Sequence, residues 1–99
     1  MGKSALVPIA EGTEEIEAVC IIDTLRRAGV DVTVASVGKL QITASRLVRI
    51  VADTTIDRCV DQTFDLIALP GGTKGAENLA ESQILQQSRR HGFAPCTMR

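Results

Sequence analysis

Three glutamates near the amino terminus are the first candidates for chemistry. Glu14, Glu15 and Glu17 follow the Gly12-Thr13 turn and open a predicted helix. Glu17 borders the apolar side of that helix, whereas Glu15 is expected to point toward solvent. A carboxyl group held against apolar neighbours keeps its proton to higher pH, because burial disfavours the charged form, and it can then donate a hydrogen bond. The alternative is that all three carboxylates only complement the positive end of the helix dipole.

A glycine-rich turn is the second candidate. The apolar run at residues 66–69 leads directly into Pro70-Gly71-Gly72-Thr73-Lys74-Gly75. Free backbone N–H groups at a strand-to-helix turn can stabilise an oxyanion, or bind a carboxylate or a phosphate. The spacing matches neither the dinucleotide fingerprint nor the P-loop, and Lys74 lacks the Ser or Thr partner of a P-loop lysine. A nucleotide site is therefore weakly supported, and a bare glycine turn is usually only a turn.

The cysteines form the third group. Cys20, Cys59 and Cys96 are odd in number and widely spaced, which fits reduced thiols better than a disulfide framework. Cys20 and Cys59 lie on predicted helices and are expected to be small buried hydrophobic residues. Cys96 has no predicted helix amino terminus or cation beside it to activate its thiol as a nucleophile. No Cys/His cluster has metal-ligand spacing, so no metal site is expected.

A series of strands and helices must position these residues. The apolar run at residues 4–9 predicts a strand, and Glu14-Glu15 opens a helix that ends before Gly29. Residues 31–37, rich in β-branched types, predict a second strand parallel to the first. The buried face of the helix is predicted from the helical spacing of its apolar residues, which are Ala18, Ile21, Ile22, Leu25 and Ala28.

The rest of the chain also reads as short alternating elements. We expect two short strands at residues 40–43 and 47–51, which could pair as a hairpin, and a short helix at residues 56–60. We also expect a strand buried on both faces at residues 66–69, a single helical turn at residues 76–79 and a second helix at residues 82–91. Alternating strands and helices predict an open α/β layer structure of the flavodoxin-like kind.

Three separate motifs occur together in this chain. They are Leu-Pro-Gly-Gly-x-x-Gly-Ala-x-Asn-Leu at residues 69–79, Glu-Glu-x-Glu at residues 14–17 and Leu-Arg-Arg-Ala-Gly-Val at residues 25–30. In this combination the sequence resembles the DJ-1/ThiJ/PfpI family over residues 4–88, and residues 89–99 diverge. The resemblance implies one partial domain over residues 1–99. Its fold would be a flavodoxin-like three-layer sandwich with a mostly parallel sheet, truncated after the central strand and the following helix.

The divergent tail occupies the region where the family has its nucleophilic cysteine. In the family, a short apolar strand and a tight elbow that holds a nucleophilic cysteine follow the last helix. Here Phe93-Ala94-Pro95 is expected to be too short for that strand, and Pro95 is expected to break it. We therefore expect the chain to lack the nucleophile, and its sheet to keep an unpaired edge beside the central strand.

The resemblance implies a set of site residues and no cofactor. Glu17 takes the position of the acid/base partner of the missing cysteine, and the amides of Gly71 and Gly72 would stabilise an oxyanion. Gly75 and Arg46 would contact the substrate. The implied activity is that of a cysteine-dependent glyoxalase or deglycase acting on small reactive carbonyls, with redox-stress and chaperone roles. The 99 residues alone are expected to be inactive.

Composition narrows the classes of partner that the chain is expected to bind. The net charge of −1 and the presence of only two aromatic residues leave no basic stripe or stacking platform for nucleic acid. No apolar run reaches the roughly 18 residues of a membrane span, and no secretory signal is recognised, so a cytoplasmic location without a membrane partner is expected. The alternative to an enzyme is a binding module that pairs with a second copy. The resemblance implies a homodimer through the first helix, where Ile16, Val19 and Cys20 lie off the apolar stripe.

Overall fold

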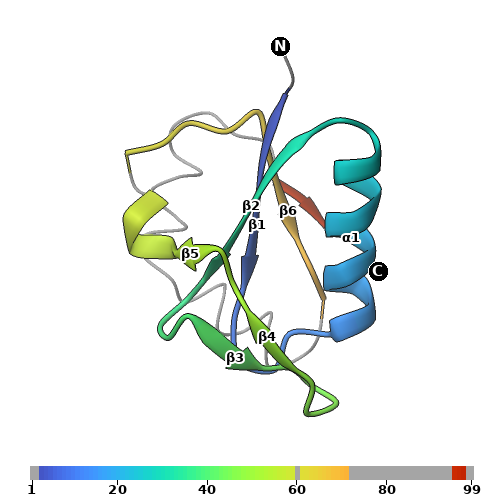
Figure 1. Ribbon diagram of the computed structural model, residues 1–99, viewed down its shortest axis with the longest axis vertical. Helices are drawn as coiled ribbons and strands as arrows, with labels where there is room; N and C mark the ends of the chain where they lie inside the picture. Colours follow the sequence, from blue (N-terminus) through green and yellow to red (C-terminus); the bar gives the residue numbers. More distant parts are fainter. Residues whose placement is uncertain (1–2, 60, 72–94, 98–99) are drawn as a thin grey trace.

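A five-stranded sheet forms the centre of the molecule. A computed structural model describes residues 3–59, 61–71 and 95–97, and the strand order in this sheet is β5-β2-β1-β6-β7 (Figure 1). All of its neighbouring strands are parallel, as the sequence predicts. The strands are β1 (Ser4–Ile9), β2 (Asp31–Ser36), β5 (Thr54–Thr55), β6 (Leu66–Leu69) and β7 (Pro95–Thr97).

Within the described residues, a helix, a β-hairpin and a short 3-10 helix pack around the sheet. Helix α1 (Glu15–Arg27) connects β1 to β2, and the predicted hairpin is present as the antiparallel strands β3 (Gln41–Thr43) and β4 (Arg49–Val51). The short helix expected near Cys59 is the 3-10 helix η1 (Ile56–Cys59). The helices expected at 76–79 and 82–91 lie outside the described residues. Within those residues, no helix has the length and apolar character that crossing a membrane requires.

Helix α1 begins and ends where the sequence predicts. The Glu14 side chain is the N-cap and accepts hydrogen bonds from the N–H groups of Ile16 and Glu17. Gly29 follows the helix with φ of 84°, a conformation that glycine adopts without strain. The prediction that Ala28 belongs to the buried stripe was wrong. Ala28 is exposed, because the helix ends at Arg27 and Ala28 is its C-cap.

The two faces of the sheet carry separate hydrophobic clusters. Alternate residues of β1 face opposite sides, as the strand period requires, so that Val7 packs with α1 and Leu6 packs near η1. Strand β6 likewise sends Ala68 to the first cluster and Ile67 to the second. Both faces of this strand are therefore covered, which confirms the sequence-based expectation for residues 66–69.

Pro8 limits the pairing between β1 and β6. The N–H of Asp65 donates to the carbonyl of Ser4, so the even-numbered residues of β1 direct their backbone groups toward β6. Pro8 is one of them and has no N–H to donate. The register between β1 and β6 ends at the pair Leu6–Ile67, whereas that between β1 and β2 continues to Ile9–Ser36. The carboxyl ends of β1 and β6 are thus freed from each other.

The tail differs from the prediction made for it. Residues 95–97 form a strand parallel to β6, with Cys96 opposite Ala68. Pro95 does not break this strand because it is the first residue, a position where a missing N–H is tolerated. The expectation of an unpaired edge beside β6 was therefore wrong as well, since β7 covers that edge. Cys96 lies within the strand and not on an elbow after it.

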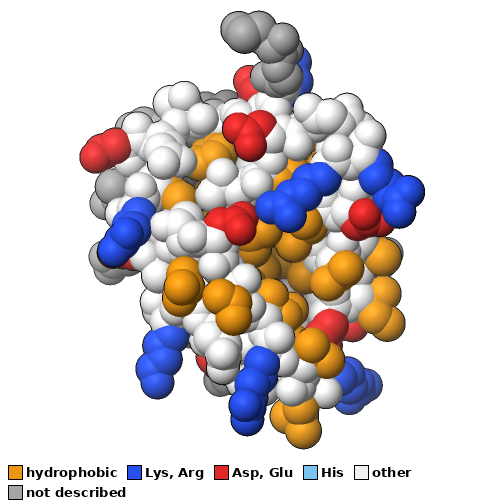
Figure 2. Space-filling view, viewed as in Figure 1, with side chains coloured by type: hydrophobic (Ala, Val, Ile, Leu, Met, Phe, Trp, Pro, Cys, Tyr) orange, Lys and Arg blue, Asp and Glu red, His pale blue; other side chains and the backbone are white. Residues whose placement is uncertain are grey.

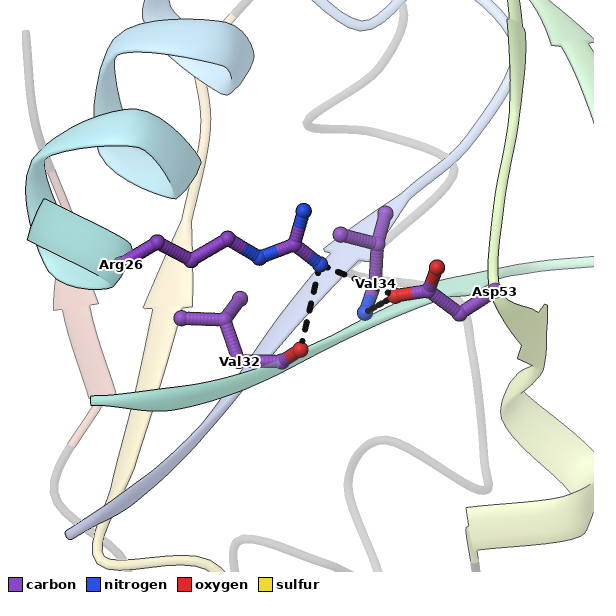
Figure 3. Close-up of polar contacts among 4 residues, drawn as sticks. All are labelled: Arg26, Val32, Val34 and Asp53. Carbon is purple, nitrogen blue, oxygen red and sulfur yellow. Dashed lines mark hydrogen bonds and ion pairs between the residues drawn. The ribbon is translucent and has the colours of Figure 1, made fainter. Parts of the chain in front are cut away.

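Polar contacts join helix α1 to strand β2 and to Asp53, which directly precedes β5 (Figure 3). The Arg26 guanidinium donates to the carbonyl of Val32 and to the carboxylate of Asp53, each at 3.3 Å. The same carboxylate accepts the N–H of Val34 at 2.9 Å. Arg26 and Asp53 thus form an ion pair. With both side chains about half exposed (50% and 53%), the pair is worth less than about 1 kcal/mol, and its main effect is to fix the ends of these elements.

Candidate functional site

The site lies where the strand order changes direction. From β1 the chain passes through α1 to β2 on one side, while β6 lies on the other side. Ligands in open parallel sheets usually bind at such a point, beyond the carboxyl ends of the strands. The turn after β6 meets the start of α1 here, since the N–H of Glu14 donates to the carbonyl of Gly71 at 3.0 Å.

A compact turn fixes the start of the helix. The Thr13 side chain is fully buried, and its hydroxyl accepts the N–H of Ala10 at 2.9 Å. The N–H of Thr13 in turn donates to the carbonyl of Ala10 at 3.0 Å. Gly12, with φ of 84°, donates its N–H to Thr43 at the end of β3. The first turn of α1 is therefore held from both β1 and the hairpin.

Glu17 and Gly71 are in direct contact. A Cβ atom placed on Gly71 would lie 2.8 Å from each carboxylate oxygen of Glu17 and 3.1 Å from its Cδ, which leaves room for a hydrogen atom only. The Oε1 atom of Glu17 is buried and has no hydrogen-bond partner among the described residues. Leaving a buried oxygen unpaired costs free energy, and such a group in a native structure needs an explanation. Gly72 and Gly75 lie outside the described residues.

Glu15 behaves differently from the prediction. Expected to point toward solvent, it is only 8% exposed, and its carboxylate accepts hydrogen bonds from the hydroxyl of Ser45 (3.0 Å) and the N–H groups of Arg46 (2.7 Å) and Val48 (3.3 Å). Burial alone would raise the pKa of Glu15. The hydrogen bonds from its own backbone and from these three residues outweigh burial, and they hold the pKa below its ordinary value.

No described contact joins the side chain of Arg46 to Glu17 or Gly71. The contact it makes is through its backbone N–H, and the side chain is exposed. The prediction that it contacts substrate stays a prediction.

The two cysteines with described side chains differ in their surroundings. Cys59 is buried, as predicted, and its thiol donates to the carbonyl of Thr55 at 3.8 Å. Burial, together with the negative charge of Asp57, raises the pKa of the Cys59 thiol, so little reactive thiolate is present at neutral pH. Cys20 is exposed, and the prediction that it is buried was wrong. It faces outward because the core side of α1 is occupied by Ala18 and Ile21.

Across residues 3–59, 61–71 and 95–97, no group of three acidic, cysteine or histidine side chains could hold a metal ion.

The sequence model of the DJ-1/PfpI family matches residues 3–94. The chain belongs to this family. It is 53% identical over 81 residues to Protein DJ-1 homolog B of Arabidopsis thaliana, a match that covers 81% of this chain and 18% of that protein. It is 36% identical over 84 residues to the glutathione-independent glyoxalase DJR-1.2 of Caenorhabditis elegans, covering 84% of this chain and 45% of the relative.

The fold agrees with solved structures of family members. The oxidized DJ-1 of Toxoplasma gondii superposes with a TM-score of 0.92 at 44% identity, covering 97% of this chain and 55% of that chain. The chain spans less than half the length of both the Arabidopsis thaliana and the Caenorhabditis elegans relative.

The contact between Glu17 and Gly71 predicts the effect of adding one methyl group. In Gly71→Ala the new Cβ must displace the Glu17 carboxylate, the flexible end of a side chain, so we expect a loss of stability below about 1 kcal/mol. Gly29→Ala is the matched control: it has open space but φ of 84°, so it should cost about 1 kcal/mol and leave Glu17 in place. Thermal unfolding and the carboxyl ¹³C signal of Glu17 measure both effects. An unmoved Glu17 signal in Gly71→Ala would contradict the contact.

The lowered pKa of Glu15 predicts how stability depends on pH. A carboxyl group with a lower pKa when folded contributes stability above its unfolded pKa, near the ordinary value of 4.5, and loses that contribution as pH falls through the folded pKa. Urea unfolding from pH 7 to pH 3 should therefore show a steeper loss of stability below about pH 4.5 for the native chain than for Glu15→Gln. Asp61→Asn, at an exposed carboxylate, is the control. Parallel curves for the native chain and Glu15→Gln would rule out this role of Glu15.

Proposed function

We propose that this chain supplies the acid and amide half of a cysteine-dependent site that acts on small reactive carbonyls, as a glyoxalase or deglycase does. The observation that supports the proposal is the buried Oε1 of Glu17, which has no hydrogen-bond partner among residues 3–59, 61–71 and 95–97 and lies beside Gly71 at the carboxyl ends of the central strands. A buried carboxyl oxygen that no described residue satisfies is suited to exchange a proton with a group that the site receives. The name of the Caenorhabditis elegans relative, a glutathione-independent glyoxalase, agrees with this chemistry.

The first chemical step assigns a role to each group. Glu17 accepts the proton of a cysteine thiol, and the resulting thiolate attacks the aldehyde carbon of a substrate such as methylglyoxal. A carbon–sulfur bond forms while the π electrons of the carbonyl move to its oxygen. The amides of Gly71 and Gly72 would stabilise this oxyanion, and Glu17 returns the proton to give a hemithioacetal. Arg46 and Gly75 would contact the substrate.

We also propose that these 99 residues alone are inactive. Cys59 is buried in the cluster on the η1 side of the sheet, and Cys20 is exposed on α1, so we expect neither described thiol to serve as the nucleophile. The redox-stress and chaperone roles and the cytoplasmic location that the resemblance implies remain predictions.

A graft tests the proposed role of Glu17. Residues 3–71 of this chain replace the matching segment of the Caenorhabditis elegans glyoxalase, which supplies the rest of the site. We expect the chimera to convert methylglyoxal, and Glu17→Gln in it to lower kcat/KM at least about 100-fold, because general acid–base catalysis contributes factors of this size. Asp61→Asn, exposed and distant in sequence, is the control. Equal activity of the Glu17→Gln chimera and its parent would exclude the acid role.

The 99-residue chain provides the complementary measurement. Lactate formation from methylglyoxal should not exceed that of buffer. Turnover that is lost in Glu17→Gln but survives Cys96→Ser would show that another nucleophile serves this site.

A second candidate function is an interaction module that forms a homodimer. Ile16 and Val19 on α1 are 71% and 55% exposed, and Cys20 beside them is exposed as well. Hydrophobic side chains gather over α1 and the β3–β4 hairpin (Figure 2), and the hairpin contributes Leu47 and Val48, which are 80% and 52% exposed. Large exposed apolar patches usually mark interfaces. We propose that a second copy of the chain covers this patch.

Light scattering after size-exclusion chromatography tests the pairing. The native chain should elute with the mass of two chains, and Val19→Glu should elute as one, because a charge at the centre of an apolar interface is left unpaired. Gln62→Glu adds the same charge at an exposed position after η1 and should leave the dimer intact. A native chain that stays monomeric at about 100 μM, some two orders above typical micromolar affinities, would exclude the dimer.

A further inference from the structure

The turn at the tip of the β3–β4 hairpin has the form of an anion site. The N–H groups of Arg46 and Val48 both point to one carboxylate oxygen of Glu15, and the Ser45 hydroxyl donates to the other. The turn is closed by its own hydrogen bonds, from Ala44 N–H to Val48 and from Leu47 N–H to Ala44. Backbone N–H groups that converge in this way bind anions. Here the anion is part of the same chain.

The backbone of the turn is strained. Leu47 has φ of 70°, the one positive value at a non-glycine residue within the described chain, and its side chain is 80% exposed. A leucine in this conformation costs about 1–2 kcal/mol and gains little from packing when its side chain is exposed. The hydrogen bonds that offset this cost are those received by the Glu15 carboxylate, since charged acceptors form the stronger bonds.

The same turn is linked to the candidate site. The N–H of Ser45 donates to the carbonyl of Thr13, directly before the helix, and Glu15 lies in the same helical turn as Glu17. The next residue back, Glu14, both caps that turn and binds the carbonyl of Gly71. The start of the helix is therefore held both by the hairpin tip and by the turn after β6.

We infer that Glu15 is a positioning residue: its carboxylate is the resident anion of the 44–48 turn, and this contact fixes the first turn of α1 so that Glu17 stays against Gly71. In this role, Glu15 contacts neither Gly71 nor a substrate. The functional meaning rests on the proposed role of Glu17, but the positioning does not require turnover. It can therefore be measured on the 99-residue chain itself.

Amide hydrogen exchange and NMR chemical shifts test the inference. In Glu15→Gln the N–H groups of Arg46 and Val48 should exchange about tenfold faster, as loss of hydrogen bonds to a charged group implies, while amides of β1 and β2 stay protected. The carboxyl ¹³C signal of Glu17 and the amide signal of Gly71 should shift in the same variant. Asp23→Asn, an exposed carboxylate on the same helix, should change none of these signals.

Chemical rescue separates the anion site from a general loss of structure. In Glu15→Ala, sodium formate should restore slow exchange at Arg46 and Val48, because a small carboxylate can occupy the vacated turn, whereas sodium chloride at equal ionic strength should not. If both Glu15 variants fail to fold, Ser45→Ala removes one donor and keeps the carboxylate. It should raise the same exchange rates by a smaller factor and shift the Glu17 signal in the direction of release.

Two results would overturn the inference. Unchanged exchange at Arg46 and Val48 in Glu15→Gln, or in Ser45→Ala if that variant is needed, would show that the turn does not depend on the carboxylate. Faster exchange there with unmoved Glu17 and Gly71 signals would show that Glu15 holds the hairpin without positioning the site. Either result is distinct from failure of the proposed function, which the Glu17→Gln chimera reports independently.

Discussion

One backbone hydrogen bond joins the two parts of the candidate site. The N–H of Glu14, at the start of α1, donates to the carbonyl of Gly71, in the turn after β6. These two residues are separated by most of the described chain, and the parallel pairing of β1 with β6 brings them together. Because Pro8 ends that pairing early, the contact beyond the strand ends depends on this bond and on the close fit of Glu17 over Gly71.

Two neighbouring carboxylates have different roles at the start of the helix. Glu15 is buried with three hydrogen-bond donors, so its charge is stabilised and it contributes to the folded structure. Glu17 has a buried oxygen without a partner among the described residues, which is unfavourable for folding. Functional sites often retain such a cost, because a group already satisfied by the protein is less available to a substrate or a nucleophile.

Local patterns predicted most of the elements but not the contacts between distant ones. Helix α1 and the position of Glu17 beside its apolar stripe follow from periodicity and capping, which act over a few residues, and so do strands β1, β2, β3, β4 and β6. The two-residue strand β5 was not predicted, because its pairing with β2 defines it. Glu15 was misjudged because its partners come from the hairpin about thirty residues away, and a helical wheel shows only its own helix. The strand at Pro95 was missed for a related reason. Its stability comes from pairing with β6, and the short tail itself carries no strand pattern.

The most direct measurement of the central claim is the scalar coupling across the hydrogen bond between the Glu14 nitrogen and the Gly71 carbonyl carbon, observed by NMR in the uniformly ¹³C,¹⁵N-labelled chain. The account predicts a detectable coupling, together with a nuclear Overhauser effect between the Glu17 side chain and the Gly71 Hα atoms. Absence of both signals in a folded chain with intact β1–β6 pairing would contradict it, because the acid and the glycine turn would then not meet.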